Sequence, residues 1–221
     1  MKKSGDVWLP DLDTYFSPYF DSGQGFQLDR LDTALSFLDP NRFGIAVDGG
    51  AHVGSWTKVL AGCFKKVLAF EPAADTFDCL CQNTRNLPNV YQFNQPLGDK
   101  ERRVKIVDDI TREGNTGSRY IQDVDAHEVV SITRTSTTVT IDSLVLSGLD
   151  FLKLDVEGAE LLALKGARDT ILKYKPVIFI ESKKGMAERF GGYTGDALEF
   201  LRNLGAAEVA KIKSDYVYMF K

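Results

Sequence analysis

A glycine turn near the start of the chain joins an apolar strand to a helix, and it reads Val47-Asp48-Gly49-Gly50-Ala51-His52-Val53-Gly54. Glycine allows positive φ and lets a ligand approach a backbone that carries no Cβ. The helix that follows leaves N–H groups without intrahelical partners, and these can bind a ligand. The turn therefore predicts a small-molecule site, the alternative being an ordinary tight connection between strand and helix.

Glu71 is the second polar residue of this predicted site, because it follows the next apolar strand, 66–70. An acidic side chain at that end of a parallel strand can hold both hydroxyls of a ribose. Pro72, which comes next, suits the first turn of a helix. The glycine turn and Glu71 together predict an adenosine site.

The details of the turn decide which adenosine cofactor is favoured. Gly49, Ala51 and Gly54 stand where a dinucleotide-binding turn has its three glycines, so the middle glycine is missing. Asp48, directly before the turn, would repel a pyrophosphate but can hold the ammonium group of an amino acid. Adenosine joined to an amino acid describes S-adenosylmethionine, which the sequence favours over NAD or a flavin.

Length and composition indicate one α/β domain with appendages. The chain has 221 residues, a hydrophobic fraction of 43% and a formal net charge of −4. This balance argues against a large nucleic-acid interface, which usually needs a basic face. The three cysteines lack C-x-x-C spacing, no leader opens the chain and no apolar run approaches the length of a membrane span. We therefore expect a cytoplasmic protein.

Strands and helices alternate along most of the chain, which predicts a mostly parallel sheet with helices on both faces. Leucines at helical spacing predict a helix over 28–38. We expect strands ending at Asp48 and covering 66–70, 90–93, 151–155 and 177–180, helices over 54–63, 73–86, 158–173 and 195–204, and a closing antiparallel hairpin of 207–212 and 216–220. Between 97 and 141 the pattern changes to strands at 103–107, 129–133 and 135–141, which we interpret as a β-rich insertion.

Three carboxylates are expected at the same end of the sheet as the glycine turn. Asp155 and Glu157 follow the strand at 151–155, and Glu181 follows the next apolar strand. Ligands of open parallel sheets lie beyond the carboxyl ends of the strands. These residues are therefore candidate catalytic groups, Asp155 first, as a general base or acceptor-positioning group. Binding of a divalent cation by Asp155 and Glu181 is an alternative that we do not favour, because no third ligand is evident.

We expect His127 to be a solvated loop residue.

Several segments, in order, resemble the FkbM family of S-adenosylmethionine-dependent methyltransferases: 48–54, Glu71 with Pro72, 94–99, 140–144 and 151–160, followed by Gly166, Pro176 and Glu181. The resemblance implies a class I methyltransferase, Rossmann-like sheet of seven strands with the last antiparallel. It implies that the cofactor is held by Asp48, Gly49, Gly50, Ala51, His52, Gly54, Glu71 and Pro72, with Asn94, Gln95 and Leu97 bordering the adenine and Asp155 a further candidate contact. Family members usually carry Asn where this chain has His52.

The sequence and the resemblance together predict an S-adenosylmethionine-dependent O-methyltransferase that acts on a hydroxyl of a small molecule or saccharide. We expect residues 1–43 to form an arm and helix packed on a methyltransferase domain of 44–221, with the insertion at 97–141. We expect no nucleic-acid partner and no membrane span, and a homodimer is compatible with the aromatic N-terminal arm. The alternatives are a nucleic-acid methyltransferase, which would need a basic, aromatic-lined groove, and a catalytically silent cofactor-binding or assembly module.

Overall fold

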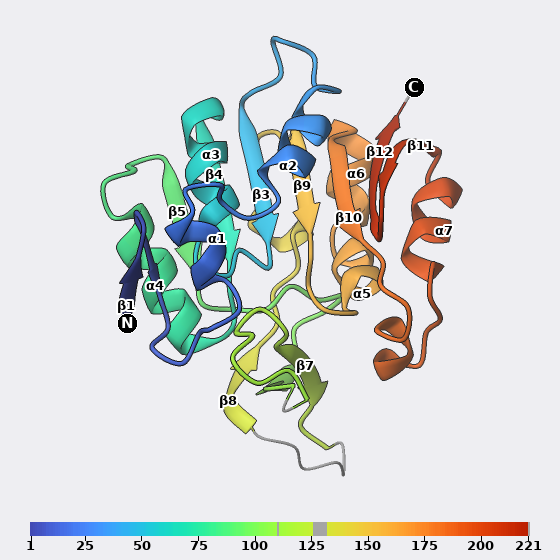
Figure 1. Cartoon of the computed structure of the whole chain (residues 1–221). Helices are drawn as coiled ribbons and strands as arrows, with labels where there is room; N and C mark the ends of the chain where they lie inside the picture. The colour runs from blue at the N-terminus through green and yellow to red at the C-terminus, as the bar shows by residue number, and fades with distance from the viewer. Residues whose placement is uncertain (110, 126–131, 221) are drawn as a thin grey trace.

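The computed structural model describes residues 1–109, 111–125 and 132–220. A seven-stranded sheet forms its centre, in the order β11-β12-β10-β9-β3-β4-β5 (Figure 1). Strands β10 to β5 of this order are parallel, and β12 runs antiparallel to both β10 and β11. The strands are β3 (Ile45–Gly49), β4 (Lys66–Phe70), β5 (Val90–Phe93), β9 (Phe151–Leu154), β10 (Val177–Glu181), β11 (Ala206–Ile212) and β12 (Asp215–Phe220). The predicted parallel sheet with a closing antiparallel hairpin is confirmed.

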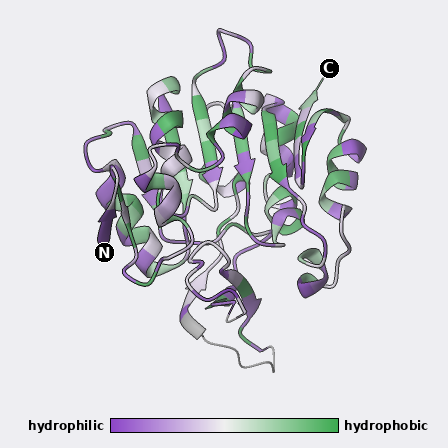
Figure 2. Ribbon diagram, viewed as in Figure 1, coloured by the Kyte–Doolittle hydropathy of each residue, from purple (hydrophilic) through white to green (hydrophobic). Residues whose placement is uncertain are grey.

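Helices cover both faces of this sheet. Successive strand residues point to opposite faces, so in β3 Ala46 packs in the cluster with α2, α3 and α4, while Val47 packs in the cluster with α5, α6 and α7. The helices are α2 (Leu28–Leu35), α3 (Ser55–Cys63), α4 (Ala74–Thr84), α5 (Glu160–Lys165), α6 (Arg168–Tyr174) and α7 (Asp196–Asn203). Because both faces are covered, the central strands are largely apolar, as Figure 2 shows.

The prediction of one helix over 158–173 is wrong, because the chain forms two helices there, α5 and α6, on either side of Gly166. A Cβ on Gly166 would lie 2.0 Å from the carbonyl oxygen of Gly98. The loop after β5 therefore passes directly against the break. The short 3₁₀ turn η1 (Asp142–Leu144) lies beside the same region, and its Asp142 main-chain N–H donates to the carbonyl oxygen of Gly166 at 2.8 Å.

The insertion forms a separate sheet in the order β7-β6-β8; Figure 1 shows β7 and β8 of it below the central sheet. Its strands are β6 (Arg103–Val107), β7 (Tyr120–Asp123) and β8 (Ile132–Thr137). The prediction misses β7, and the strand expected over 135–141 is wrong in extent, since β8 ends at Thr137 and Val139 makes only an isolated bridge to Leu97. Most of the strand expected over 129–133 lies outside the described residues, as does His127.

The N-terminal segment forms a hairpin, β1 (Lys2–Ser4) and β2 (Val7–Leu9), and a short helix, α1 (Ser17–Asp21). Asn83 of α4 accepts a hydrogen bond from the Trp8 N–H at 2.7 Å and donates one to the Trp8 carbonyl oxygen at 2.9 Å. Phe16 and Phe20 are buried against Val53 of the glycine turn. The segment thus packs on the turn and on α4. No helix in the described ranges is both long and apolar enough to cross a membrane.

Candidate functional site

A cavity of about 290 Å³ lies at the carboxyl ends of the parallel strands. It is lined by the glycine turn after β3, the segments after β4, β5, β9 and β10, the N-terminal segment and the loop 112–121. Aromatic side chains from the N-terminal segment, among them Tyr15, Phe16 and Phe26, make up part of its wall. An open parallel sheet is expected to hold its ligand at this end.

Most of the predicted site residues meet in this cavity. Its wall includes Gly50, Ala51, His52, Glu71, Pro72, Gln95, Leu97, Asp155, Glu157 and Glu181. These residues come from four strand ends and the turn, so the sheet brings together groups that lie up to 131 positions apart in the sequence. The structure therefore joins the predicted adenosine site and the predicted carboxylate cluster in one pocket.

Four predicted cofactor contacts lie behind the wall: Asp48, Gly49, Gly54 and Asn94 are not among the lining residues. The fully buried Asp48 carboxylate accepts a hydrogen bond from the Thr57 hydroxyl at 2.6 Å and lies 3.0 Å from the Lys153 ammonium. Asn94 donates from its side chain to the carbonyl oxygen of Glu71 at 2.8 Å. Both side chains brace the residues that do line the cavity.

Lys153 lines the pocket, and the sequence analysis gives it no role. Its ammonium donates to the carbonyl oxygens of Gly50, at 2.8 Å, and Gly49, at 3.2 Å, and pairs with Asp48. Burial opposes the charge, but the nearby carboxylates of Asp48 and Asp155 outweigh it and raise the pKa of Lys153. A single charged residue inside the otherwise apolar strand β9 was the signal that could have revealed it.

The glycine turn is in close contact with the segment after β9. Gly50 has φ of +74°, and a Cβ there would lie 1.8 Å from the carbonyl oxygen of Asp155. The Asp155 N–H donates to the carbonyl oxygen of Gly49 at 3.1 Å. Only glycine combines this backbone conformation with so close an approach, so the turn fixes where the Asp155 main chain lies.

The Glu71 carboxylate is held by three donors. One oxygen accepts the Ala73 N–H and the Thr76 hydroxyl, each at 2.9 Å, and the other accepts the His52 N–H at 2.9 Å. Burial raises the pKa of Glu71, against the lowering effect of these hydrogen bonds. Each carboxylate oxygen can accept more than one hydrogen bond. The side chain is therefore fixed in place and can still accept from a ligand in the cavity.

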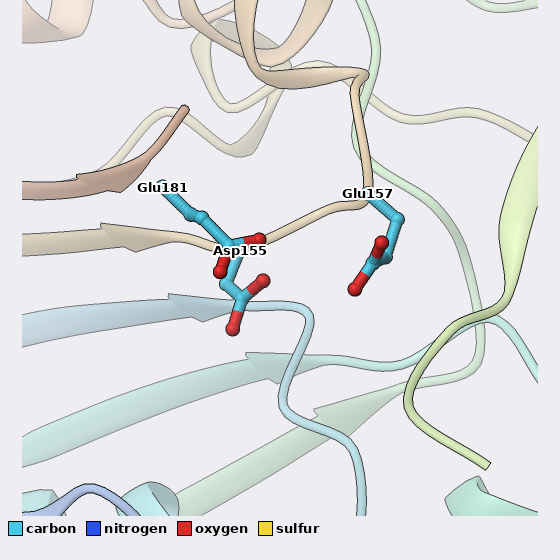
Figure 3. Close-up of side chains that lie close together, drawn as sticks. All are labelled: Asp155, Glu157 and Glu181. Atoms are coloured by element: carbon cyan, nitrogen blue, oxygen red, sulfur yellow. The ribbon is translucent and has the colours of Figure 1, made fainter. Parts of the chain in front are cut away.

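Asp155, Glu157 and Glu181 lie together at the strand ends, each with a carboxylate oxygen within 4.8 Å of the others (Figure 3). Lys183 joins them, its ammonium 2.7 Å from Glu181 Oε2 and 3.2 Å from Glu157 Oε1. Glu157 has φ of +52°, and its Oε2 is buried with no hydrogen-bond partner among the described residues. Glu157 thus supplies the third possible ligand that is not evident in the sequence, while Lys183 provides a positive charge beside the cluster. The expectation that the cluster binds no metal ion stays a prediction.

The carboxyl groups of the cluster differ in their tendency to ionise. Burial and the adjacent charge of Asp155 raise the pKa of Glu181 to about 10. Burial opposes ionisation of Asp155 as well, but Lys153, Lys183 and a hydrogen bond from Glu181 together lower its pKa. Their surroundings thus favour the protonated form of Glu181 and the ionised form of Asp155, the difference expected of two neighbouring carboxyl groups.

Glu160 shapes the loop that carries two of these residues. Its buried carboxylate accepts the Val156 N–H at 3.1 Å and the Gly158 N–H at 3.2 Å. Burial raises the pKa of Glu160 to about 7, against the lowering effect of its backbone hydrogen bonds. Gly158 itself has φ of +105°, and a Cβ there would meet the Met186 carbonyl oxygen at 2.4 Å. Glu160 and Gly158 therefore keep Glu157 in its left-handed conformation.

Comparison with known proteins gives a family and a fold. Residues 48–207 match the family model of the methyltransferase FkbM domain. The fold is similar to that of methyltransferase FkbM from Methylobacillus flagellatus KT, at 19% identity and a TM-score of 0.50; the match covers 94% of this chain and 55% of that one. A methyltransferase candidate from Streptococcus mutans, solved in complex with SAH, matches at 16% identity and a TM-score of 0.50, over 87% of this chain and 95% of that one. No curated protein sequence matches.

Proposed function

Since the chain belongs to the FkbM methyltransferase domain family, we propose that it transfers a methyl group from S-adenosylmethionine to a hydroxyl oxygen of a small molecule or saccharide. The observation that carries this proposal is the position of Glu71. Its fixed carboxylate lines the same cavity as the glycine turn and Asp155. The cavity thus offers an acceptor for ribose hydroxyls on one side and a carboxylate base on the other.

The residues present fit this cofactor. The Glu71 carboxylate would accept hydrogen bonds from the ribose hydroxyls, and Gln95, Pro96 and Leu97 line the cavity and would border the adenine. Lys153 keeps the carbonyl oxygens of the glycine turn in place and supplies a positive charge that can attract the cofactor carboxylate. Asp48 acts on the cofactor through Lys153 and the turn, since its carboxylate lies behind the wall.

When bound, S-adenosylmethionine supplies a methyl group on a sulfonium, which an oxygen nucleophile takes by in-line displacement. Asp155 accepts a hydrogen bond from the acceptor hydroxyl and then its proton, so it both orients the nucleophile and removes the proton. Glu181 donates to Asp155 and fixes the direction in which its free oxygen points. Lys183 balances the charge of Glu157 beside them. Because its neighbours lower the pKa of Asp155, alignment of the acceptor contributes more than base strength.

Isothermal titration calorimetry tests the cofactor assignment. We expect the protein to bind S-adenosylhomocysteine, the demethylated product, in preference to NAD. Glu71→Ala should weaken this binding by about 1–3 kcal/mol, since it removes the ribose acceptor. Glu101→Ala, at an exposed position away from the cavity, is the matched control and should bind as the wild type does. Tight NAD binding with no heat from S-adenosylhomocysteine would show that the assignment is wrong.

A further inference from the structure

Three segments far apart in the sequence meet through one buried hydroxyl group. The Thr116 hydroxyl, from the loop before β7, donates to Asp13 Oδ2 at 2.6 Å and lies 2.8 Å from His52 Nε2. Asp13 belongs to the N-terminal segment and is fully buried, and Thr116 is 7% exposed. The Phe16 ring packs on the His52 imidazole with centroids 4.5 Å apart. The contact therefore ties the N-terminal segment and the insertion to the glycine turn.

The direction of these hydrogen bonds fixes the tautomer of His52. A threonine hydroxyl has one proton, and here it is donated to the Asp13 carboxylate. The hydroxyl oxygen must then accept from His52, so the imidazole proton lies on Nε2. Burial lowers the pKa of His52 to about 4, so the ring is neutral near pH 7 and Nδ1 carries no proton.

The main chain of His52 extends this connection to the proposed ribose contact. His52 has φ of +52°, a left-handed conformation that is uncommon outside glycine but is more frequent for Asn, Asp and His. In this conformation its N–H donates to Glu71 Oε2 at 2.9 Å. The side chain of His52 is fixed by Thr116 while its main chain orients Glu71. No atom of Thr116 or Asp13 forms a hydrogen bond with Glu71.

We propose that His52 is a positioning residue of the cofactor site, which Thr116 and Asp13 hold so that its main-chain N–H keeps Glu71 directed at the ribose. The proposal rests on the proposed function, because it takes Glu71 as the ribose contact. Binding of the adenosine end then requires the N-terminal segment and the loop 112–121 to be docked on the turn. This dependence goes beyond the direct contacts in the cavity wall.

Calorimetry with S-adenosylhomocysteine and with methylthioadenosine tests the proposal. Thr116→Val removes the shared hydroxyl and should weaken both ligands about tenfold, the effect of roughly one hydrogen bond to a charged group. Thr116→Ser keeps the hydroxyl and should restore binding to within about twofold of the wild type. Ser118→Ala is the matched control, because Ser118 is buried in the same loop but donates only to the Asn115 carbonyl oxygen. Thermal unfolding of each variant checks that it is folded.

The pattern of losses separates the possible outcomes. Equal affinities for Thr116→Val and Ser118→Ala would overturn the positioning role while leaving the proposed function intact. Weakening of S-adenosylhomocysteine alone would also overturn it, because methylthioadenosine has the same ribose and lacks only the amino acid. Absence of any S-adenosylhomocysteine binding by the wild type would instead overturn the proposed function.

Nitrogen-15 NMR of the imidazole gives a readout that a general loss of packing would not reproduce. The chain has two histidines, so a single His127→Gln variant assigns the His52 signals. We expect the wild type to show a protonated Nε2 and an unprotonated Nδ1 near pH 7. Thr116→Val should shift the balance of tautomers, whereas Ser118→Ala should not. A proton on Nδ1 in the wild type would contradict the proposal.

Discussion

At the scale of single residues, Asp155 and Glu71 are proposed to divide the work between acceptor and cofactor. Asp155 belongs to the carboxylate cluster after β9, and Glu71 follows β4, which β3 separates from β9. Asp155→Asn keeps the shape of the side chain and removes its charge. We expect a loss of about 10²- to 10⁴-fold in methyl transfer, the usual effect of removing a general base, with S-adenosylhomocysteine affinity within about threefold of the wild type.

This prediction is measured with a labelled methyl donor, once a screen of hydroxylated acceptors has found a substrate. Glu101→Gln, which removes a charge at an exposed position, is the control. If Asp155→Asn loses binding and transfer together, Asp155 belongs to the cofactor contacts. Activity that a chelator abolishes and magnesium restores would show that the cluster binds a metal ion.

Glu181 gives a prediction about stability and pH. Folding raises its pKa from 4.5 to about 10. Below pH 4.5 both the folded and the unfolded chain hold this proton, but between pH 4.5 and 10 only the folded chain does, so the contribution of Glu181 to stability falls as the pH rises. Glu181→Gln keeps a donor toward Asp155 and has no proton to lose. It should unfold at the wild-type temperature near pH 4 and at a higher temperature near pH 8, by about 2–4 °C for each kcal/mol of stability that the wild type loses over this range.

Thermal unfolding at the two pH values checks this sign, with Glu101→Gln as the exposed control. A Glu181→Gln variant that is less stable than the wild type at pH 8 would mean that Glu181 is ionised in the folded protein. In that case the ion pair with Lys183 would lower the pKa of Glu181 by more than burial and the charge of Asp155 raise it.

Single residues also mark the limit of what the sequence could predict about the site. Asp155, Glu157 and Glu181 could be placed together because parallel strand ends meet at one edge of a sheet. Asp13 and Thr116 could not, since they are 103 positions apart and neither lies at a strand end. The sequence predicts that Asp48 holds the ammonium group of an amino acid, and nothing near Asp48 in the sequence indicates its ion pair with Lys153 of β9.

At the scale of elements, the close contact of the glycine turn with the segment after β9 can be tested by comparing two glycines. They have the same φ, but only one of them has a close neighbour. Gly50 and Gly23 both have φ of +74°, and a Cβ on Gly23 would meet nothing within 4 Å. Gly23→Ala should destabilise the protein by about 1–2 kcal/mol, from the left-handed conformation alone. Gly50→Ala should add about 1–3 kcal/mol from the contact with the Asp155 carbonyl oxygen, and it should abolish S-adenosylhomocysteine binding.

Urea unfolding measures both variants against the wild type, and calorimetry measures their ligand binding. Equal destabilisation by the two substitutions would mean that the turn moves away from Asp155 without cost. The close contact between the glycine turn and the segment after β9 would then not be what fixes the geometry of the cofactor site.

The elements themselves differ in how well the sequence predicts them. The apolar strands β3, β4, β9 and β10 could be placed within one or two residues, because long alternation with helices leaves few other arrangements. The hairpin of β1 and β2 has only three residues in each strand, too few to show a period. The break at Gly166 depends on a carbonyl oxygen of Gly98, and a contact of this kind leaves no local pattern.

At the scale of the whole molecule, the balance of charge predicts that nucleic acid does not bind. The formal net charge is −4. The three arginines of the described cavity wall are paired: Arg30 with Asp215, Arg112 with Asp109, and Arg119 with Asp75 and Asp108. Binding of phosphates needs free cations whose counterions are released. We expect no gel shift of RNA or DNA at micromolar protein in about 150 mM salt. A complex with submicromolar affinity under these conditions would favour a nucleic-acid acceptor.

The joining of Asp13 to Thr116 also has a consequence for biosynthesis. A ribosome that adds about 5–20 residues per second makes Asp13 roughly 5–20 s before Thr116, the residue whose hydroxyl donates to it. During that time the Asp13 carboxylate has only local partners such as the Phe16 N–H, so this part of the chain is made early but completes its packing late. The cavity wall also needs Lys183 and Ser214. A nascent chain therefore gains its pocket only when nearly all of the sequence has been translated, and interrupted synthesis leaves no smaller version of the site.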